Sequence, residues 1–130
     1  MTKLNENLEI RNTGKKLKDI PFTDVYSTSE VKTNKVWTDG KPIYKKTLIG
    51  TYNNEAVLLS NVSTLVNSYG ECDPGTGLAR QLPYYELWNN MEFCCRIHKN
   101  TANQVILYSK SSGSAHNATL KVTLEYTKTS

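Results

Sequence analysis

Three cysteines and two histidines are the residues of this chain best able to bind a metal or attack a substrate: Cys72, Cys94, Cys95, His98 and His116. A structural zinc site takes four such ligands, which commonly come in closely spaced pairs such as Cys-x-x-Cys. No such pair occurs here, and the two histidines stand far apart. Cys94 and Cys95 are adjacent, so on a strand their side chains point to opposite faces and do not easily share one ion. We therefore expect no metal and no cofactor.

Catalysis would need more than suitable residue types. A thiol beside His98 could act as a nucleophile, but it also needs an orienting third group and an oxyanion donor, and the sequence indicates neither. Paired carboxylates for sugar hydrolysis would have to come from a dispersed set: Asp24, Asp39, Asp73, Glu86 and Glu92. Asp39 and Asp73 are better explained by the turn and the loop in which they stand. We expect no enzyme activity.

The redox state of the cysteines stays open. An odd number of cysteines, with no apolar leader in residues 1–7, favours reduced thiols in a cytoplasm. A disulfide between Cys72 and either Cys94 or Cys95 is possible geometrically, but the sequence does not identify it.

Aromatic residues offer a binding surface instead. Tyr84, Tyr85 and Trp88 gather within five residues, directly after Pro83. Such rings stack on sugars or close a protein interface, although one of them can fill the core. We expect one of the three rings to fill the core, with Trp88 as the first candidate, and the remaining rings to be exposed. A flexible polar tip over residues 111–117, which includes His116 and Asn117, is the second candidate for ligand or interface contact.

Strand patterns dominate the chain from residue 24. Leu120, Val122, Leu124 and Tyr126 alternate with polar neighbours, which is typical of a half-buried antiparallel strand. Further strands are expected over residues 30–38, 41–50, 55–59, 91–98 and 104–110.

One segment breaks the strand pattern. Val62, Leu65 and Val66 stand at helical spacing after a Ser-Asn start, and Gly70 is available as a C-terminal cap. The sequence therefore predicts a mainly β fold, an antiparallel β-sandwich-like domain over residues 24–130, with one short helix over residues 60–68.

Residues 1–23 differ from this domain and are expected to form an N-terminal anchoring arm. They are too short and too weakly amphipathic for an independent helix. The candidate anchors are apolar and basic: Leu4, Leu8, Ile10, Lys15, Lys16, Leu17, Lys18 and Ile20. The equal alternative is that Leu8 and Ile10 lie in a first edge strand of the domain.

Charge is concentrated near the start of the chain. Residues 1–50 hold ten Lys or Arg against six Asp or Glu, which accounts for the whole net charge of +4. A basic arm can dock on an acidic surface, or it can simply be solvated. Four excess charges without interleaved aromatic residues are too weak a pattern for nucleic-acid binding. No apolar run reaches the 18 residues of a membrane span, so neither nucleic acid nor membrane is expected as a partner.

The strongest local signal is a hairpin whose residues are Trp37, Thr38, Asp39, Gly40, Lys41, Pro42, Ile43 and Tyr44. Asp-Gly predicts a tight turn, because Gly takes positive φ without steric cost. Pro42 follows the turn and suggests an edge position. The rings of Trp37 and Tyr44 flank the turn and are expected to approach one another.

This hairpin and four other segments resemble, in the same order, a small β-rich domain that recurs in phage and prophage virion appendages. Tail fibres, baseplate components and head fibres carry that domain. The similar segments are residues 26–30, 36–47, 60–70, 82–84 and 122–129. Residues 71–80 and 92–98 depart from the pattern, so specificity could differ there.

The resemblance implies a non-enzymatic bacteriophage structural protein, assembled in the bacterial host cytoplasm and located in the virion. With only about 22 residues before the domain, a short head fibre or capsid decoration fits better than a long-shafted tail fibre, as in crAss-like phages. Its partners would be itself, as a homodimer or homotrimer, and capsid or tail proteins bound through the arm. The alternative is a receptor-binding tail fibre or baseplate module that recognises host-surface glycans.

Overall fold

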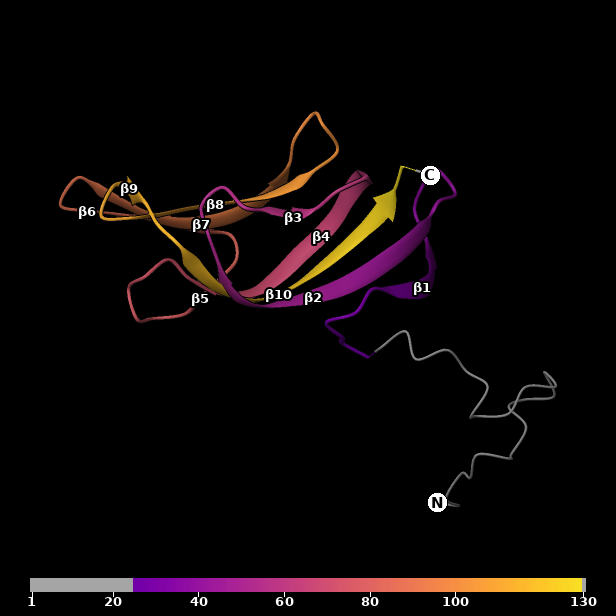
Figure 1. Cartoon of the computed structure of the whole chain (residues 1–130), viewed down its shortest axis with the longest axis horizontal. Helices are drawn as coiled ribbons and strands as arrows, with labels where there is room; N and C mark the ends of the chain where they lie inside the picture. Colours follow the sequence, from indigo (N-terminus) through magenta and orange to yellow (C-terminus); the bar gives the residue numbers. More distant parts are fainter. Residues whose placement is uncertain (1–24, 130) are drawn as a thin grey trace, which may run out of the picture.

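The computed structural model describes residues 25–129, which form two facing antiparallel β-sheets (Figure 1). The first sheet has the strand order β1-β2-β10-β4-β5, and the second has the order β3-β8-β7-β6, with β9 paired to β8. The strands are β1 (Val31–Val36), β2 (Pro42–Tyr52), β3 (Val57–Leu59), β4 (Val62–Asp73), β5 (Arg80–Gln81), β6 (Tyr84–Trp88), β7 (Met91–Lys99), β8 (Val105–Ser111), β9 (Ser114–Ala115) and β10 (Ala118–Lys128). The predicted mainly β, sandwich-like architecture is confirmed.

The predicted anchoring arm, residues 1–23, lies outside the described residues together with all of its candidate anchors. Both expectations for this segment therefore stay predictions. Within residues 25–129 there is no helix, and so none that is long and apolar enough to cross a membrane.

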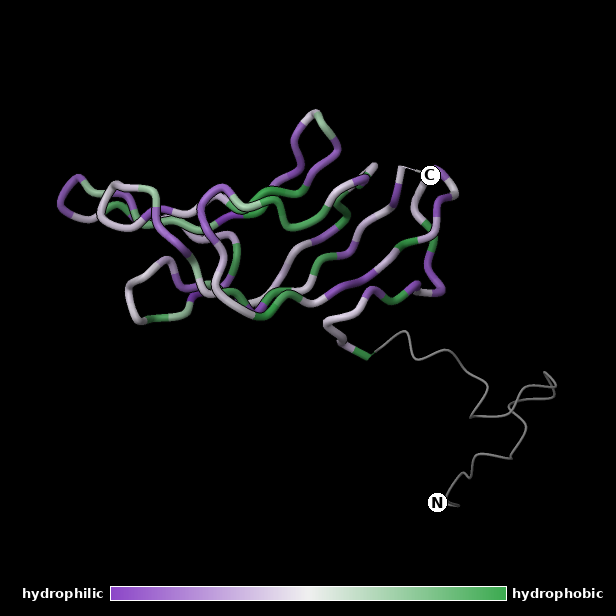
Figure 2. Tube along the Cα trace, in the orientation of Figure 1, coloured by the Kyte–Doolittle hydropathy of each residue, from purple (hydrophilic) through white to green (hydrophobic). Residues whose placement is uncertain are grey.

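The core is built around β10, whose alternation agrees with the prediction. Leu120, Val122 and Leu124 are at most 1% exposed, and they point into the space between the sheets. Val105 and Leu107 of β8, both fully buried, belong to the same cluster. Figure 2 shows hydrophobic residues concentrated along the strands, while the turn after β7 is largely hydrophilic. Burial of these aliphatic side chains between two sheets is the main apolar contribution to the fold.

The predicted short helix over residues 60–68 is wrong, because this segment begins β4. The helical spacing has another cause: β4 pairs with β10 through two irregularities. Opposite Thr127 and Lys128, β4 passes from Thr64 to Val62, so Ser63 is an extra residue between Val62 and Leu65. The other irregularity, opposite Glu125 and Tyr126, makes Val66 an extra residue. A bulge of this kind resets the alternation of the strand. Val62 and Leu65 therefore both reach the core although they stand three residues apart.

The Asp-Gly hairpin forms as predicted between β1 and β2. Gly40 has φ of 85° and donates its N–H to the Trp37 carbonyl at 2.9 Å, and Trp37 in turn donates its N–H to the Lys41 carbonyl. This is a three-residue loop closed by a residue in the left-handed conformation, where glycine is favoured. Asp39 adds a side-chain acceptor for the Lys41 N–H at 3.0 Å.

The expected edge position of Pro42 is wrong, because β2 lies between β1 and β10. Pro42 is tolerated as the first residue of β2, two residues before the pairing with β10 reaches Tyr44. At the start of a strand the missing N–H interrupts no ladder. The ring partner of Tyr44 is Tyr126 in β10, at 6.3 Å between centroids.

We expect Leu124→Ala to lower the free energy of unfolding by about 2–5 kcal/mol, because the truncated side chain leaves a cavity in the buried centre of the sandwich. The matched control is Ile49→Ala on β2. Ile49 is 60% exposed, so its truncation should change the free energy by less than about 0.5 kcal/mol. Urea unfolding followed by tryptophan fluorescence measures both, and equal losses would contradict the assignment of β10 to the core.

Candidate functional site

The cysteines are structural residues in this fold. Cys72 in β4 and Cys95 in β7 form a disulfide between the two sheets, with their Cα atoms 6.5 Å apart. Both are fully buried. The default expectation of reduced thiols is therefore wrong for this pair, because facing strands bring two inward-pointing cysteines within bonding reach. Cys94 points to the opposite face of β7, as expected from its adjacency to Cys95, and remains a buried free thiol.

Cys94 and His98 do not assemble as a nucleophile and its base. They stand four residues apart on one strand, which separates them by about 13 Å. Burial raises the pKa of the Cys94 thiol, and the nearby Glu92 carboxylate raises it further, so the thiol stays protonated at neutral pH. Among residues 25–129, no group of three His, Cys, Asp or Glu side chains is placed to hold a metal ion.

The candidate carboxylates are separated as well. Glu86 of β6 pairs in register with Phe93, whereas Glu92 pairs with Leu87, so the two carboxylates lie on opposite faces of the β6–β7 hairpin. Glu86 accepts a hydrogen bond from the Tyr84 hydroxyl at 3.0 Å. Two other candidates are accounted for locally, since Asp39 caps its turn and Asp73 accepts the N–H groups of its own loop. Asp24 lies outside the described residues.

The β6–β7 hairpin carries the predicted aromatic cluster. Its turn is Asn89-Asn90, with φ of 50° and 62°, which is the two-residue geometry that suits the twist of paired strands. Tyr84 packs against the core, whereas Tyr85 is 64% exposed and Trp88 is 61% exposed. The prediction of one core ring is confirmed, but its assignment to Trp88 is wrong.

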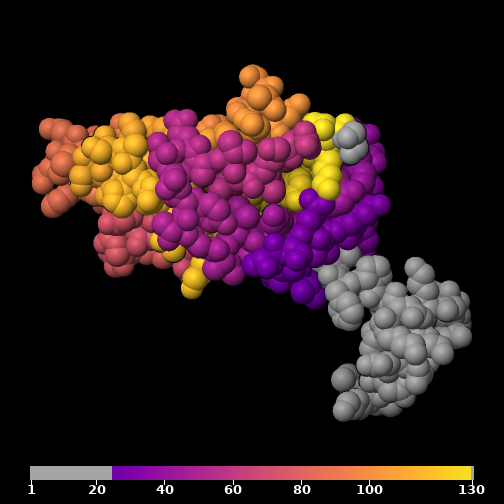
Figure 3. Space-filling model, in the orientation of Figure 1, coloured from indigo at the N-terminus to yellow at the C-terminus, as the bar shows by residue number. Residues whose placement is uncertain are grey.

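The length of the hairpin explains the exposure of Trp88. Trp88 lies on the same face as Tyr84, but about 13 Å farther along the strand. The pairing of β10 with β4 ends at Asp73, one residue beyond the disulfide, so the first sheet does not extend under Trp88. The hairpin therefore forms one end of the molecule (Figures 1 and 3). Leu87, on the other face, is also 58% exposed.

The predicted flexible tip is a tight hairpin. Ser112 and Gly113 have φ of 53° and 80°, and β9 pairs back onto β8. The Gly113 N–H donates to the Glu92 carbonyl at 2.9 Å, which holds this turn beside β7. The tip and the aromatic hairpin thus meet at the same end of the molecule (Figure 1).

His116 and Asn117 are both exposed, and they follow β9. The His116 ring nitrogen Nδ1 lies 2.7 Å from the Asn117 carbonyl, and the Ser109 hydroxyl donates to the His116 carbonyl. The imidazole lies over Gly75, where an added Cβ would collide with the ring. His116 therefore packs on the loop after β4 rather than joining the aromatic rings.

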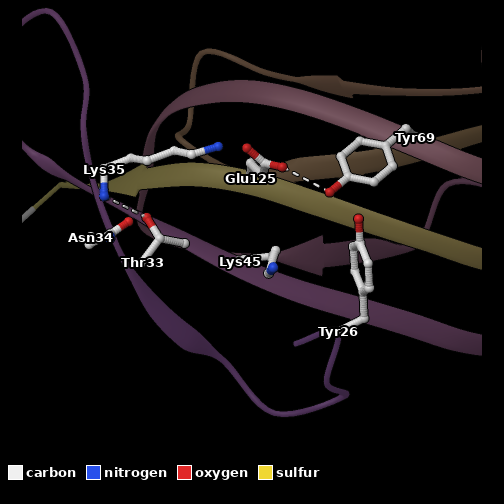
Figure 4. A pocket seen from close by; sticks show the side chains of 7 residues that line it. All are labelled: Tyr26, Thr33, Asn34, Lys35, Lys45, Tyr69 and Glu125. Carbon is white, nitrogen blue, oxygen red and sulfur yellow. Dashed lines mark hydrogen bonds between the residues drawn. The ribbon is translucent and has the colours of Figure 1, made fainter. Parts of the chain in front are cut away.

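A polar pocket on the outer face of the first sheet was not anticipated from the sequence. It encloses about 310 Å³, and its lining side chains come from four strands and the segment before β1: Tyr26, Thr33, Asn34, Lys35, Lys45, Tyr69 and Glu125 (Figure 4). Their positions in the sequence are up to about a hundred residues apart. The only sequence pattern that pointed to this face was the strand alternation that places Glu125 on the outer side of β10.

Hydrogen bonds and ring contacts organise this pocket. The Tyr69 hydroxyl donates to Glu125 at 2.8 Å, and burial together with this carboxylate raises the pKa of Tyr69. The rings of Tyr26 and Tyr69 make a T-shaped contact with 6.4 Å between their centroids, and the Lys45 ammonium lies 4.6 Å from the centre of the Tyr26 ring. The hydroxyls of the two tyrosines point toward one another (Figure 4).

Comparison with protein-family models, with curated proteins and with solved structures finds no match to this chain. The resemblance to virion appendages therefore stays a prediction from the motifs.

The motif hairpin contributes to a charged cluster at the far end of β10. The Lys128 ammonium pairs with Glu30 and lies 4.4 Å from the centre of the Tyr44 ring. Tyr126 donates its hydroxyl to Glu30 at 2.6 Å, and the Lys41 ammonium donates to the Lys128 carbonyl at 3.2 Å. Lys41 and Tyr44 of the Asp-Gly hairpin thus have a structural role, because both contact Lys128 at the end of β10.

Because of this cluster, we expect part of the free energy of unfolding to be lost at acid pH. Burial of the Glu30 carboxyl would raise its pKa, but the hydrogen bonds from Lys128 and Tyr126 outweigh it and place the pKa below the usual 4.5. A carboxylate with a depressed folded pKa stabilises the protein above its unfolded pKa, and this contribution is lost as pH falls through the folded pKa.

We therefore expect Glu30→Gln to lower the free energy of unfolding at pH 7 by about 1 kcal/mol, after allowance for solvent screening of this partly exposed group. The difference from the wild type should shrink as the pH is lowered from 5 to 3. Urea unfolding at each pH measures it, with Glu55→Gln in an exposed loop as the control. A difference that stays constant with pH would contradict the role of the ionised carboxylate.

Proposed function

We propose that this chain is a non-enzymatic virion structural protein, a short homo-oligomeric head fibre or capsid decoration subunit anchored through residues 1–23. The observation that carries the proposal is the β6–β7 hairpin, whose Tyr85, Leu87 and Trp88 are each more than half exposed at one end of the molecule. The ordered motifs that resemble virion appendage domains support the virion setting.

The composition of the hairpin favours a protein partner of its own kind. Tyr and Trp are enriched in protein interfaces, whereas charged residues are depleted from their centres. Glu86 is the one charged residue of β6, and Arg80 lies 3.8 Å from it. Tyr85 and Leu87 lie on one face of the hairpin and Trp88 on the other, so a second copy of the chain would cover one of these faces with its own identical face. Such self-pairing is the commonest way that soluble proteins oligomerise.

The second candidate is a receptor-binding module for host-surface glycans, of a tail fibre or baseplate. It is favoured by the same two exposed rings, because Tyr and Trp faces stack on sugars as readily as they close interfaces. The two functions are compatible if one surface of each subunit contacts its neighbours in the oligomer and another surface contacts the receptor.

We expect the purified full-length chain to be a dimer or trimer at micromolar concentration, as measured by light scattering after gel filtration. The double substitution Leu87→Ser and Trp88→Ser should convert it to a monomer, because the truncated hairpin loses most of its apolar contact area. Ile49→Ser is the matched control, since Ile49 is equally exposed but lies on β2. A wild-type monomer at 100 μM, or equal effects of both variants, would reject this interface.

We expect the full-length protein to be detected on purified virions by immunogold labelling, and we expect a chain that lacks residues 1–20 to be absent from them. Circular dichroism and the unfolding transition of the truncated chain serve as the folding control. Virion association that persists without residues 1–20 would reject the anchoring role of the arm.

A further inference from the structure

The pocket on the outer face of the first sheet presents both kinds of hydrogen-bonding group to one space. The Glu125 carboxylate is a pure acceptor, and the Lys35 ammonium is a pure donor. The Asn34 amide and the hydroxyls of Tyr26 and Tyr69 serve in both roles. These side chains line one cavity of about 310 Å³ (Figure 4).

This mixture of groups excludes several classes of ligand. A simple anion such as phosphate would meet the Glu125 carboxylate, and a simple cation would meet the ammonium groups of Lys35 and Lys45. An apolar molecule would bury these polar groups without returning their hydrogen bonds. A ligand that carries several hydroxyls can accept from the ammonium groups and donate to the carboxylate at the same time.

The aromatic side chain adds a surface of the right kind. Tyr26 is 62% exposed, so much of its ring is open to solvent above the pocket. A T-shaped contact with Tyr69 and the Lys45 ammonium, which lies 4.6 Å from the centroid over one face of the ring, hold Tyr26 in place, so a ligand stacks on the opposite face. The C–H face of a sugar ring packs on such an aromatic face, while the hydroxyls of the sugar reach the polar groups beside it.

From this geometry we propose that the pocket binds a saccharide of one or two rings. Its volume lies at the lower end of the range of about 300–1,000 Å³ that small-ligand sites occupy. The Glu125 carboxylate accepts from sugar hydroxyls, the ammonium of Lys35 and the amide of Asn34 donate to them, and Tyr26 supplies the stacking face. The site is separate from the β6–β7 hairpin and does not depend on the oligomeric state of the chain.

The test is a titration of the ¹⁵N-labelled full-length protein, followed by amide chemical shifts, with maltose, N-acetylglucosamine and lactose as probes. Ligand efficiency allows a dissociation constant on the order of 1 mM for a ligand of about 12 non-hydrogen atoms. We expect at least one probe to shift the amides of Tyr26, Asn34 and Tyr69 in a saturable way.

Two substitutions remove the proposed contacts. Tyr26→Ala deletes an exposed ring, and Glu125→Gln keeps the shape but loses the anionic acceptor. Each should weaken binding at least about tenfold, whereas Glu71→Gln should change it less than about twofold. Glu71 is the matched control because it also lies on the outer face of the first sheet but does not line this pocket. If Glu125→Gln fails to fold, Tyr26→Ala still decides the question.

Three outcomes would overturn the proposal: no shift with any probe up to about 20 mM, equal binding by the Glu125 and Glu71 variants, or shifts confined to Tyr85 and Trp88. The last outcome would place sugar binding on the hairpin instead. The monomeric Leu87 and Trp88 variant should retain binding at this pocket, so loss of the oligomer and loss of the saccharide site are separate results.

Discussion

β10 has to be hydrogen-bonded along both of its edges at once. It pairs with β2 from Ala118 to Tyr126 and with β4 from Thr119 to Lys128. β1 joins the first sheet only through β2, and β5 joins it only through β4. Because β10 also places Leu120, Val122 and Leu124 in the core, the first sheet and the sandwich share one element. Because β10 pairs with two strands that lie far from it in the sequence, formation of the first sheet carries a large loop-closure cost.

The two sheets are not equal in extent, and the aromatic surface follows from this difference. The Cys72–Cys95 disulfide joins them near the end of the first sheet, and β6 and β7 continue past that point. Tyr84 is close enough to pack on the core, whereas Trp88 lies beyond any facing strand. The exposure of Trp88 is thus a geometric consequence of an overhanging hairpin, whereas Tyr85 is exposed because it lies on the outward face of the same hairpin. An exposed patch of this kind gains most from a partner that covers it.

The outer face of the first sheet is polar for a different reason. Lys45 and Glu125 are opposite one another in register, and Thr47 and Thr123 share a hydrogen bond of 2.8 Å. Cross-strand pairs of this kind stabilise a wet sheet face. Where Tyr26 covers part of that face, Lys45 and Glu125 line a pocket. One chain therefore carries two unlike surfaces, a hairpin with exposed Tyr85, Leu87 and Trp88 and a polar pocket lined by hydrogen-bonding groups.

The sequence by itself determined β1, β2, β3, β7, β8 and β10, the Asp-Gly turn and the inner face of β10, because alternation and turn chemistry act between neighbouring residues. It misled where tertiary pairing overrode local spacing. Two bulges, opposite Glu125–Tyr126 and Thr127–Lys128, give β4 the apolar spacing of a helix, and the unequal extent of the two sheets exposes Trp88 while Tyr84 packs against the core. The Cys72–Cys95 bond and the pocket formed by Tyr26, Tyr69 and Glu125 were decided only in three dimensions. Each depends on the register between strands that are far apart in the chain, and no local pattern specifies that register.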